Sequence, residues 1–321
     1  MIDLILAIFI LIGGIVLVIF SSKYAVKHSA LLATALGISP LIIGVTLVSI
    51  GTDISEIFNS IISCSLGHGD IDVGDSVGSD LTQLTLVFGI LPIACGAFHI
   101  RRRDIIILGS CEVLSLIVIF TIVEKGYITR LNAIFMVFSL LIYFWIIFNA
   151  NKESIMHRVE LIETTQPTKK KRYHFLIAVI GFVGVTISAF MIVQSVIIIS
   201  QEIHIHEYII SFFILAIGTS LPELVVDIHA LRGGHPGIAI GDIVGSCIVD
   251  STLSIGIGQV FFPQAVTASL AVPTVLYTLF VSIIVIVTIA VRQKMDKKAG
   301  VFFILLYISA YFLLFNINIM V

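Results

Sequence analysis

Two short motifs place acidic side chains inside apolar stretches of this 321-residue chain. The first reads Gly-Thr-Asp-Ile-Ser-Glu over 51–56, and the second reads Gly-Thr-Ser-Leu-Pro-Glu over 218–223. An acidic side chain near the centre of a bilayer costs roughly 2.5–3.5 kcal/mol on insertion scales, so its presence there indicates a functional site. Because the motifs start at 51 and 218, 167 residues apart, they predict two related halves.

Helical spacing gathers further polar residues around each motif, because residues three or four apart share one face of a helix. In the first half, Ser49, Thr52 and Glu56 form one stripe with Asp53 beside it, and Asp75, Ser79 and Gln83 form a second stripe. Their counterparts at the same offset are Ala216, Thr219 and Glu223 with Ser220, and Asp242, Ser246 and Asp250. Hydroxyl groups alone could simply join helices. The carboxylates on these stripes favour an ion site at the interface of the two halves.

The donor set consists of carboxylate, hydroxyl, amide and carbonyl oxygens. Hard oxygen ligands suit Ca²⁺, Na⁺ or Mg²⁺ and argue against zinc or copper. A buried cluster of this kind cannot stay fully ionised when empty, so it must bind cations or protons. We therefore expect transported ions and no organic cofactor.

Several acidic residues near the motifs have no role that the sequence alone assigns. Asp75 and Asp242 are equivalent positions in the two repeats, 167 residues apart. Asp80 and Asp227 could each face a helix end and water. For Glu112, outside the repeated window, we expect a protonated side chain hydrogen-bonded to a neighbour. The cysteines lack metal-binding spacing and are expected to be small buried residues; they are Cys64, Cys95, Cys111 and Cys247.

Composition identifies the elements that must position these residues. With 58% hydrophobic residues, 12% charged residues and a mean hydropathy of +1.15, the chain is predicted to be an all-α polytopic membrane protein. A net charge of −2 gives no reason to expect nucleic acid as a partner. The predicted spans are 3–21, 36–66, 71–95, 104–123, 127–149, 174–200, 207–232, 237–262, 268–291 and 299–319.

Five spans precede and five follow a charged segment at 150–173. We therefore divide the chain into repeats 1–149 and 174–321, with motif windows at about 42–91 and 209–258. Ten spans with the N-terminus outside put every Lys and Arg except Lys125 and Arg130 in the cytoplasm, linker included. This agreement with the positive-inside rule predicts a cell-membrane protein with a cytoplasmic linker. The two motif helices then cross in opposite directions, which predicts inverted-topology repeats with discontinuous helices at the site.

The second motif, with Gly-Asp-Ile-Val-Gly-Ser-Cys-Ile-Val-Asp at 241–250, resembles the second α-repeat of the cation/Ca²⁺ antiporter superfamily, particularly prokaryotic Na⁺/Ca²⁺ exchangers. The resemblance implies that Glu56 and Glu223 are central Ca²⁺ ligands, helped by carbonyls of Thr52 and Thr219. The implied flanking cation sites use Ser49, Asp53, Ser79, Gln83, Ala216, Ser220, Ser246 and Asp250. The first and sixth helices, with Gly13, Gly14, Gly181 and Gly184, are implied to slide as a gating pair.

The first motif departs from the family pattern at Asp53 and Ser55, where Ser and Pro are usual. Asp75 and Asp242 replace Asn, and Gln83 also stands where Asn is common. The primary interpretation is Ca²⁺/Na⁺ antiport by alternating access. The alternative is proton-coupled antiport of Ca²⁺ or Mg²⁺, because an added Asp could hold a proton. The chain lacks the motifs of an intramembrane hydrolase, and its oligomeric state is left open.

Overall fold

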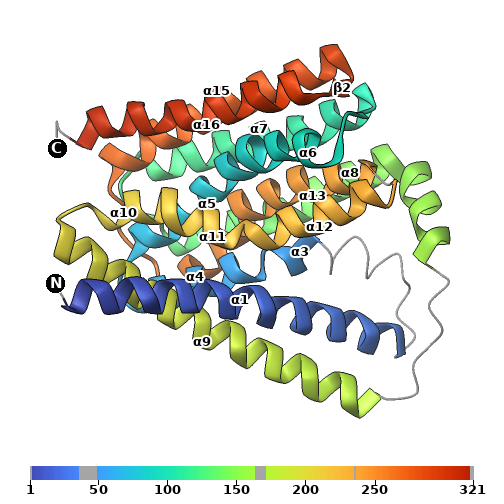
Figure 1. Ribbon diagram of the computed structural model, residues 1–321. Helices are drawn as coiled ribbons and strands as arrows, with labels where there is room; N and C mark the ends of the chain where they lie inside the picture. Colours follow the sequence, from blue (N-terminus) through green and yellow to red (C-terminus); the bar gives the residue numbers. More distant parts are fainter. Residues whose placement is uncertain (1, 36–48, 163–170, 235, 319–321) are drawn as a thin grey trace.

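The computed structural model describes residues 2–35, 49–162, 171–234 and 236–318, and this part of the chain forms a bundle of helices (Figure 1). In the first half these are α1 (Ile2–Ala35), α3 (Ser49–Thr52), α4 (Ile54–Ser65), α5 (Gly69–Leu81), the π-helical turn η2 (Thr82–Val87), α6 (Phe88–Cys95), α7 (Arg102–Val123) and α8 (Arg130–Ile162). In the second half they are α9 (Lys171–Ile203), α10 (Glu207–Ile210), η3 (Ser211–Leu215), α11 (Ala216–Thr219), α12 (Leu221–Arg232), α13 (Pro236–Val249), η4 (Asp250–Ser254), α14 (Ile255–Phe261), α15 (Ala268–Arg292) and α16 (Lys297–Asn318).

Abutting segments combine into long helices. Among the described residues, eight helices, some single and some combined in this way, are long and apolar enough to cross a membrane. The segment α3–α4 and the 22-residue helix α16 correspond to the other two of the ten predicted spans. The beginning of the predicted second span, 36–48, lies outside the described residues, as does part of the linker, 163–170. The all-α polytopic class is confirmed.

Helix boundaries recur at the offset found in the sequence. Helix α4 runs over Ile54–Ser65 and α12 over Leu221–Arg232, so both ends are displaced by 167 residues. The same shift relates the starts of α6 and α14. It also pairs the turn residues with positive φ, Gly67 with Gly234 and Gly126 with Gln293. The repeat therefore extends from the motifs to the connecting turns.

Two short backbone pairings between loops confirm that the repeats are inverted. The strands β1 (Phe98–His99) and β2 (Lys294–Met295) pair antiparallel between the α6–α7 and α15–α16 loops. A separate bridge joins Tyr127 to Ala265, between the α7–α8 and α14–α15 loops. The two pairings are equivalent under the repeat. At the offset of 167, Phe98 of β1 corresponds to Ala265 of the bridge, and Tyr127 of the bridge corresponds to Lys294 of β2. Since α7 and α15 each connect one pairing to the other, the equivalent pairings lie at opposite ends of the bundle.

Helices α1 and α9 lie side by side along one edge of the bundle (Figure 1). Small residues allow this contact: a Cβ at Gly14 would lie 2.8 Å from Ile192 Cγ1, and one at Gly181 would lie 2.6 Å from the Ala25 nitrogen. Gly13 differs from these glycines because it is exposed and its nearest contact would be 3.8 Å away. The α1–α9 pair contacts the rest of the bundle through α3, α4, α10, η3, α11 and α12.

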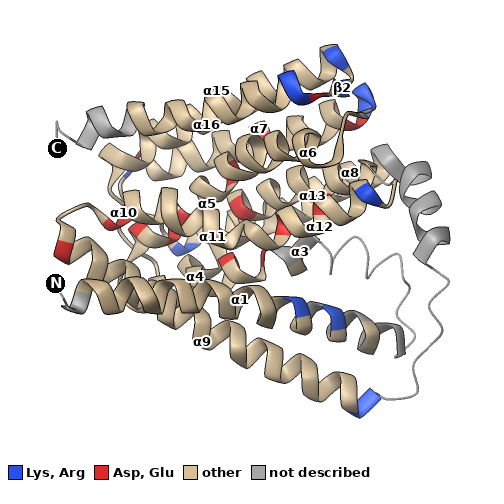
Figure 2. Cartoon of the chain, in the orientation of Figure 1, with Lys and Arg blue, Asp and Glu red and all other residues tan. Residues whose placement is uncertain are grey.

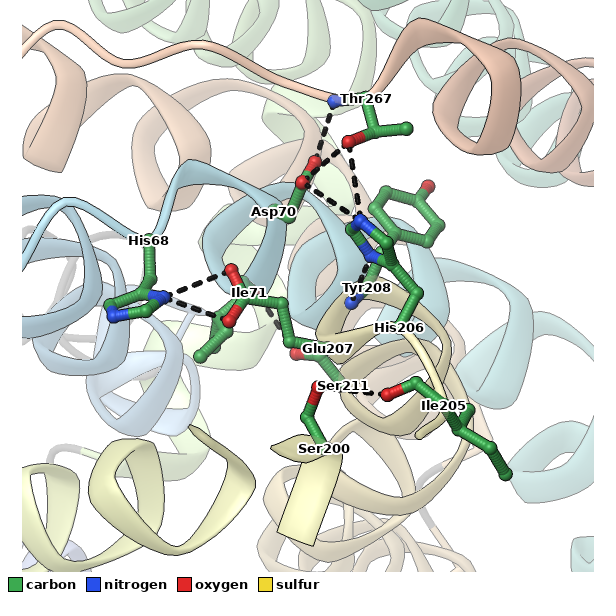
Figure 3. A network of polar contacts seen from close by, with 10 residues as sticks. All are labelled: His68, Asp70, Ile71, Ser200, Ile205, His206, Glu207, Tyr208, Ser211 and Thr267. Atoms are coloured by element: carbon green, nitrogen blue, oxygen red, sulfur yellow. Dashed lines mark hydrogen bonds and ion pairs between the residues drawn. The ribbon is translucent and has the colours of Figure 1, made fainter. Parts of the chain in front are cut away.

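Basic residues gather mainly at the end of the molecule that carries β2 and the end of α1 (Figure 2). At the other end, a polar network joins the two halves (Figure 3). His68 Nδ1 lies 2.8 Å from Glu207 Oε2, which links the start of α5 to α10. Asp70 accepts hydrogen bonds from the Thr267 backbone nitrogen at 2.6 Å and hydroxyl at 2.7 Å, which fixes α5 to the start of α15.

Candidate ion-binding site

Both motif helices break at the equivalent residue. Asp53 separates α3 from α4 with φ −81° and ψ 14°, and Ser220 separates α11 from α12 with φ −82° and ψ 1°. Pro222 contributes to the second break because it has no N–H to donate to the Gly218 carbonyl. The first motif has Ser55 in place of proline, yet it breaks with the same geometry. The discontinuous helices predicted from sequence are therefore present in both halves.

Three carboxylates meet between these breaks. Asp53, Glu56 and Glu223 are buried, and each supplies an oxygen within 4.8 Å of the other two. Ser55 Oγ donates a hydrogen bond to Glu56 Oε2 at 2.6 Å. Glu56 Oε1 and both Glu223 oxygens accept no hydrogen bond from the described residues. Since Ca²⁺ ligand oxygens lie 2.3–2.6 Å from the ion, oxygens up to about 5 Å apart can share one cation.

A second layer of hydrogen bonds surrounds the carboxylates. Thr219 Oγ1 lies 3.3 Å from Ser79 Oγ and donates to Asp75 Oδ1 at 3.2 Å. Asn59 Nδ2 donates to the other Asp75 oxygen at 3.0 Å. Asp75 had no assigned role in the sequence, and Asn59 was not among the predicted site residues. Its position three residues after Glu56, on the same face of the helix, is the signal that could have identified it.

The π-helical turns bring two equivalent residues into contact. Gln83 in η2 donates to Asp250 Oδ2 in η4 at 3.3 Å, and the two residues are 167 positions apart. Contact between equivalent residues places the pair on the pseudo-twofold axis. Single π-helical turns are frequent at functional sites, because the wider turn redirects side chains and weakens the backbone ladder. The predicted meeting of the two halves at these residues is observed.

Three more of the candidate ligands, Ala216, Ser220 and Ser246, are buried close to the helix breaks. A Cβ at Gly78 would lie 2.8 Å from Ala216 Cβ, so α5 packs directly on α11. The side chains of Ser49 and Thr52 lie outside the described part of the structure.

Three further acidic residues near the motifs, Asp80, Asp227 and Asp242, are all buried. Exposure to water, considered for Asp80 and Asp227 from the sequence, is thus wrong, because both side chains face packed helices.

Comparison with known proteins supports this architecture. The family model for sodium/calcium exchanger proteins matches residues 6–149 and 173–317. The inner membrane protein YrbG of Escherichia coli is 27% identical over 269 residues, covering 81% of each chain. The sodium/calcium exchanger MaX1 of Methanosarcina acetivorans is 26% identical over 344 residues, covering 96% of this chain and 98% of its own.

A solved structure of the sodium-calcium exchanger NCX_Mj has the same fold. It superposes with a TM-score of 0.62 at 22% identity, and the match covers 96% of this chain and 98% of the other. The fold likeness agrees with the inverted repeats. The family match spans both halves, including the two motifs and the turns that carry Gln83 and Asp250. The chain therefore belongs to the sodium/calcium exchanger protein family.

Proposed function

We propose that this protein is a secondary antiporter that exchanges Ca²⁺ for Na⁺ at the site between the two helix breaks. The observation that carries the proposal is the meeting of Asp53, Glu56 and Glu223, whose carboxylate oxygens lie within 4.8 Å of one another. None of the ion pairs of the described residues involves these carboxylates. Buried acidic oxygens without a basic partner are suited to a hard cation.

We assign Ca²⁺ to Glu56 and Glu223, one from each half, with backbone carbonyls of Thr52 and Thr219 completing its shell. Flanking cation sites are assigned to Ser49, Asp53, Ser79, Gln83, Ala216, Ser220, Ser246 and Asp250. Ca²⁺ and Na⁺ compete for these oxygens, so binding of one excludes the other. Coupling follows because a neutralised site can change its access, whereas an empty charged site resists the change.

Alternating access is assigned to movement of α1 and α9 against the rest of the bundle. The close contact at Gly14 and Gly181 supports the two helices moving as one unit. The gathering of basic residues at one end of the molecule (Figure 2) supports an orientation with the N-terminus outside and the 150–173 linker in the cytoplasm. On this assignment, residues 1–149 and 174–321 are the two repeats that form opposite walls of the pathway.

Proton coupling is a second candidate function, and it is supported by the number of negative charges at the site. Asp53, Glu56, Glu223 and Asp250 are all buried, and one Ca²⁺ cancels only two of their four negative charges. The remaining charge must be balanced by Na⁺ or by protons. A divalent cation/proton exchanger of the same fold would use Asp53 as the proton carrier in place of a Na⁺ ligand.

Uptake of ⁴⁵Ca²⁺ into proteoliposomes separates the two functions. Vesicles loaded with Na⁺ and diluted into Na⁺-free buffer should accumulate Ca²⁺, because Na⁺ leaving the vesicles drives Ca²⁺ inward. Vesicles with a pH gradient and no Na⁺ provide the comparison, and protein-free vesicles control for leakage. Uptake driven only by the pH gradient would replace Na⁺ coupling with proton coupling. Absence of uptake under both gradients would contradict Ca²⁺ antiport.

A further inference from the structure

A second buried cluster lies apart from the helix breaks. Asp80 of α5, Glu112 of α7 and Cys247 of α13 each place one ligand atom within 4.8 Å of the other two, and all three are buried. Gln83 lies between this cluster and Asp250, because its Oε1 accepts from Cys247 Sγ at 3.4 Å while its Nε2 donates to Asp250. The cluster therefore has its own set of donors, next to the central site.

The acidic groups of this cluster lack protein partners. Both oxygens of Asp80 have no hydrogen-bond partner among the described residues. Both oxygens of the Glu112 carboxylate are likewise without a hydrogen-bond partner among the described residues, because the nearby Ser115 hydroxyl donates to the Glu112 backbone carbonyl at 2.7 Å. Two carboxylates brought together in a low-dielectric interior repel each other and lose their hydration. Their charge must therefore be neutralised by bound protons or by a bound cation.

The spacing of the oxygens distinguishes a cation from a shared proton. Two carboxyl groups that share a proton approach to an O···O distance of about 2.5–2.7 Å, and no hydrogen bond joins Asp80 to Glu112. A cation with ligands at about 2.3–2.6 Å accommodates donor atoms up to about 5 Å apart. The three ligand atoms lie within 4.8 Å of one another with no hydrogen bond between the two carboxylates, which is compatible with this second arrangement.

We propose that Asp80, Glu112 and Cys247 form a second cation site, which binds one divalent ion in addition to the transported ions. The two carboxylates balance the charge of a hard ion such as Mn²⁺. A softer ion such as Cd²⁺ can also bind the Cys247 sulfur, with release of the thiol proton, which gives the site an affinity for softer divalent ions that the central oxygens lack. This role differs from the protonated side chain, hydrogen-bonded to a neighbour, that the sequence leads us to expect for Glu112. The proposal does not depend on Na⁺/Ca²⁺ exchange.

The repeat indicates that this site occurs once. Cys247 is the counterpart of Asp80 at the offset of 167, and its Sγ lies 3.8 Å from the Asp80 carbonyl oxygen. The counterpart of Glu112 is Leu279, which has no ligand atom. The inverted half therefore cannot build an equivalent cluster, and a single ion per chain is expected at this location.

Mn²⁺ binding to the purified full-length protein tests the proposal. The Glu56→Gln and Glu223→Gln changes are combined to remove the central site, and free Mn²⁺ is measured by electron paramagnetic resonance. One Mn²⁺ per chain should remain bound. Adding Glu112→Gln should weaken this binding by about tenfold or more, since a charged ligand is lost. Glu124→Gln, at an exposed position after the same helix, is the matched control and should bind as before.

Further measurements keep the test decisive. If the Glu112 variant does not fold, Asp80→Asn takes its place. If the combined central-site variant does not fold, Glu112→Gln in the otherwise unchanged chain should lower the number of bound Mn²⁺ ions by one. Cys247→Ser should weaken Cd²⁺ binding more than Mn²⁺ binding, because only the softer ion depends on sulfur. No residual Mn²⁺ site, or residual binding unchanged by both Glu112→Gln and Asp80→Asn, would overturn the proposal.

Discussion

The two halves break their motif helices at the same place with different residues. The second half has Pro222, whereas the first has Ser55 at that position, and yet the backbone angles are similar: φ is −81° at Asp53 and −82° at Ser220, and ψ is 14° and 1°. Proline is therefore not required for the break. Instead, Ser55 uses its hydroxyl to hold Glu56 at 2.6 Å. The second half has at this position a residue without a backbone N–H donor, and the first half has a hydroxyl that orients the Glu56 carboxylate.

The polar groups behind the central carboxylates also differ between the halves. Asn59 donates to Asp75 in the first half, whereas the residue equivalent to Asn59 is Val226. The second half instead buries Asp227, whose counterpart is Ser60. If the protein is an antiporter as proposed, an ion arriving from one side of the membrane meets different groups from an ion arriving from the other side. Inverted repeats give two similar halves of a site, and these substitutions make its two approaches unequal.

The largest expected effect comes from removing the ligands that the halves share. Glu56→Gln and Glu223→Gln should each reduce Ca²⁺ affinity by about a hundredfold or more, because each removes a charged ligand from a buried site. Isothermal titration measures the affinity, and Glu124→Gln should leave it unchanged. If one of the two glutamines retained full affinity, the halves would not contribute equally, and the shared-ligand assignment would be wrong.

Exchanging the unequal residues tests whether the first half sets the coupling ion. Asp53→Ser should shift the ratio of Na⁺-driven to pH-driven ⁴⁵Ca²⁺ uptake toward Na⁺ by about tenfold, equivalent to about 1.4 kcal/mol, if Asp53 carries a proton. The reciprocal change Ser220→Asp should shift the ratio in the opposite direction. Unchanged ratios in both variants would remove Asp53 from the coupling mechanism.

A smaller effect is expected from helix packing between the halves. A Cβ at Gly78 would lie 2.2 Å from the Phe212 carbonyl oxygen, so Gly78→Ala must move α5 away from η3. Overpacking of this kind costs about 1–3 kcal/mol. The thermal midpoint in detergent should fall, whereas Gly13→Ala, at an exposed position, should leave it nearly unchanged. Equal midpoints for the two variants would show that the interface tolerates movement at Gly78.

The smallest effect should come from the proline itself. If packing sets the helix break, Pro222→Ala should alter Ca²⁺ affinity by no more than about threefold, or less than about 1 kcal/mol. The first half provides the precedent, because it breaks without proline. Isothermal titration alongside the unchanged protein measures the difference. A loss comparable to that of Glu223→Gln would mean that the two breaks have different physical origins.

Much of this arrangement can be predicted from the sequence, because equivalent residues of the two repeats are separated by a constant number of positions. That offset identified Glu56 with Glu223 and Gln83 with Asp250, and the last pair is in direct contact. The ligand assignments remain predictions. The Asp80–Glu112 cluster was not predicted, because Glu112 lies outside the motif window 42–91 and comes close to Asp80 through the packing of α7 on α13. Contacts between helices that are distant in the sequence leave no recognisable spacing of residues along the chain.

Anomalous diffraction from crystals soaked with Sr²⁺ in place of Ca²⁺ tests the central claim most directly. The account predicts a peak bounded by the carboxylates of Glu56 and Glu223, at the level of the two helix breaks. The peak should disappear in the Glu223→Gln variant, because one of its charged ligands is gone. A Sr²⁺ peak absent from this position in the unchanged protein, with density only elsewhere, would contradict the shared site between the halves.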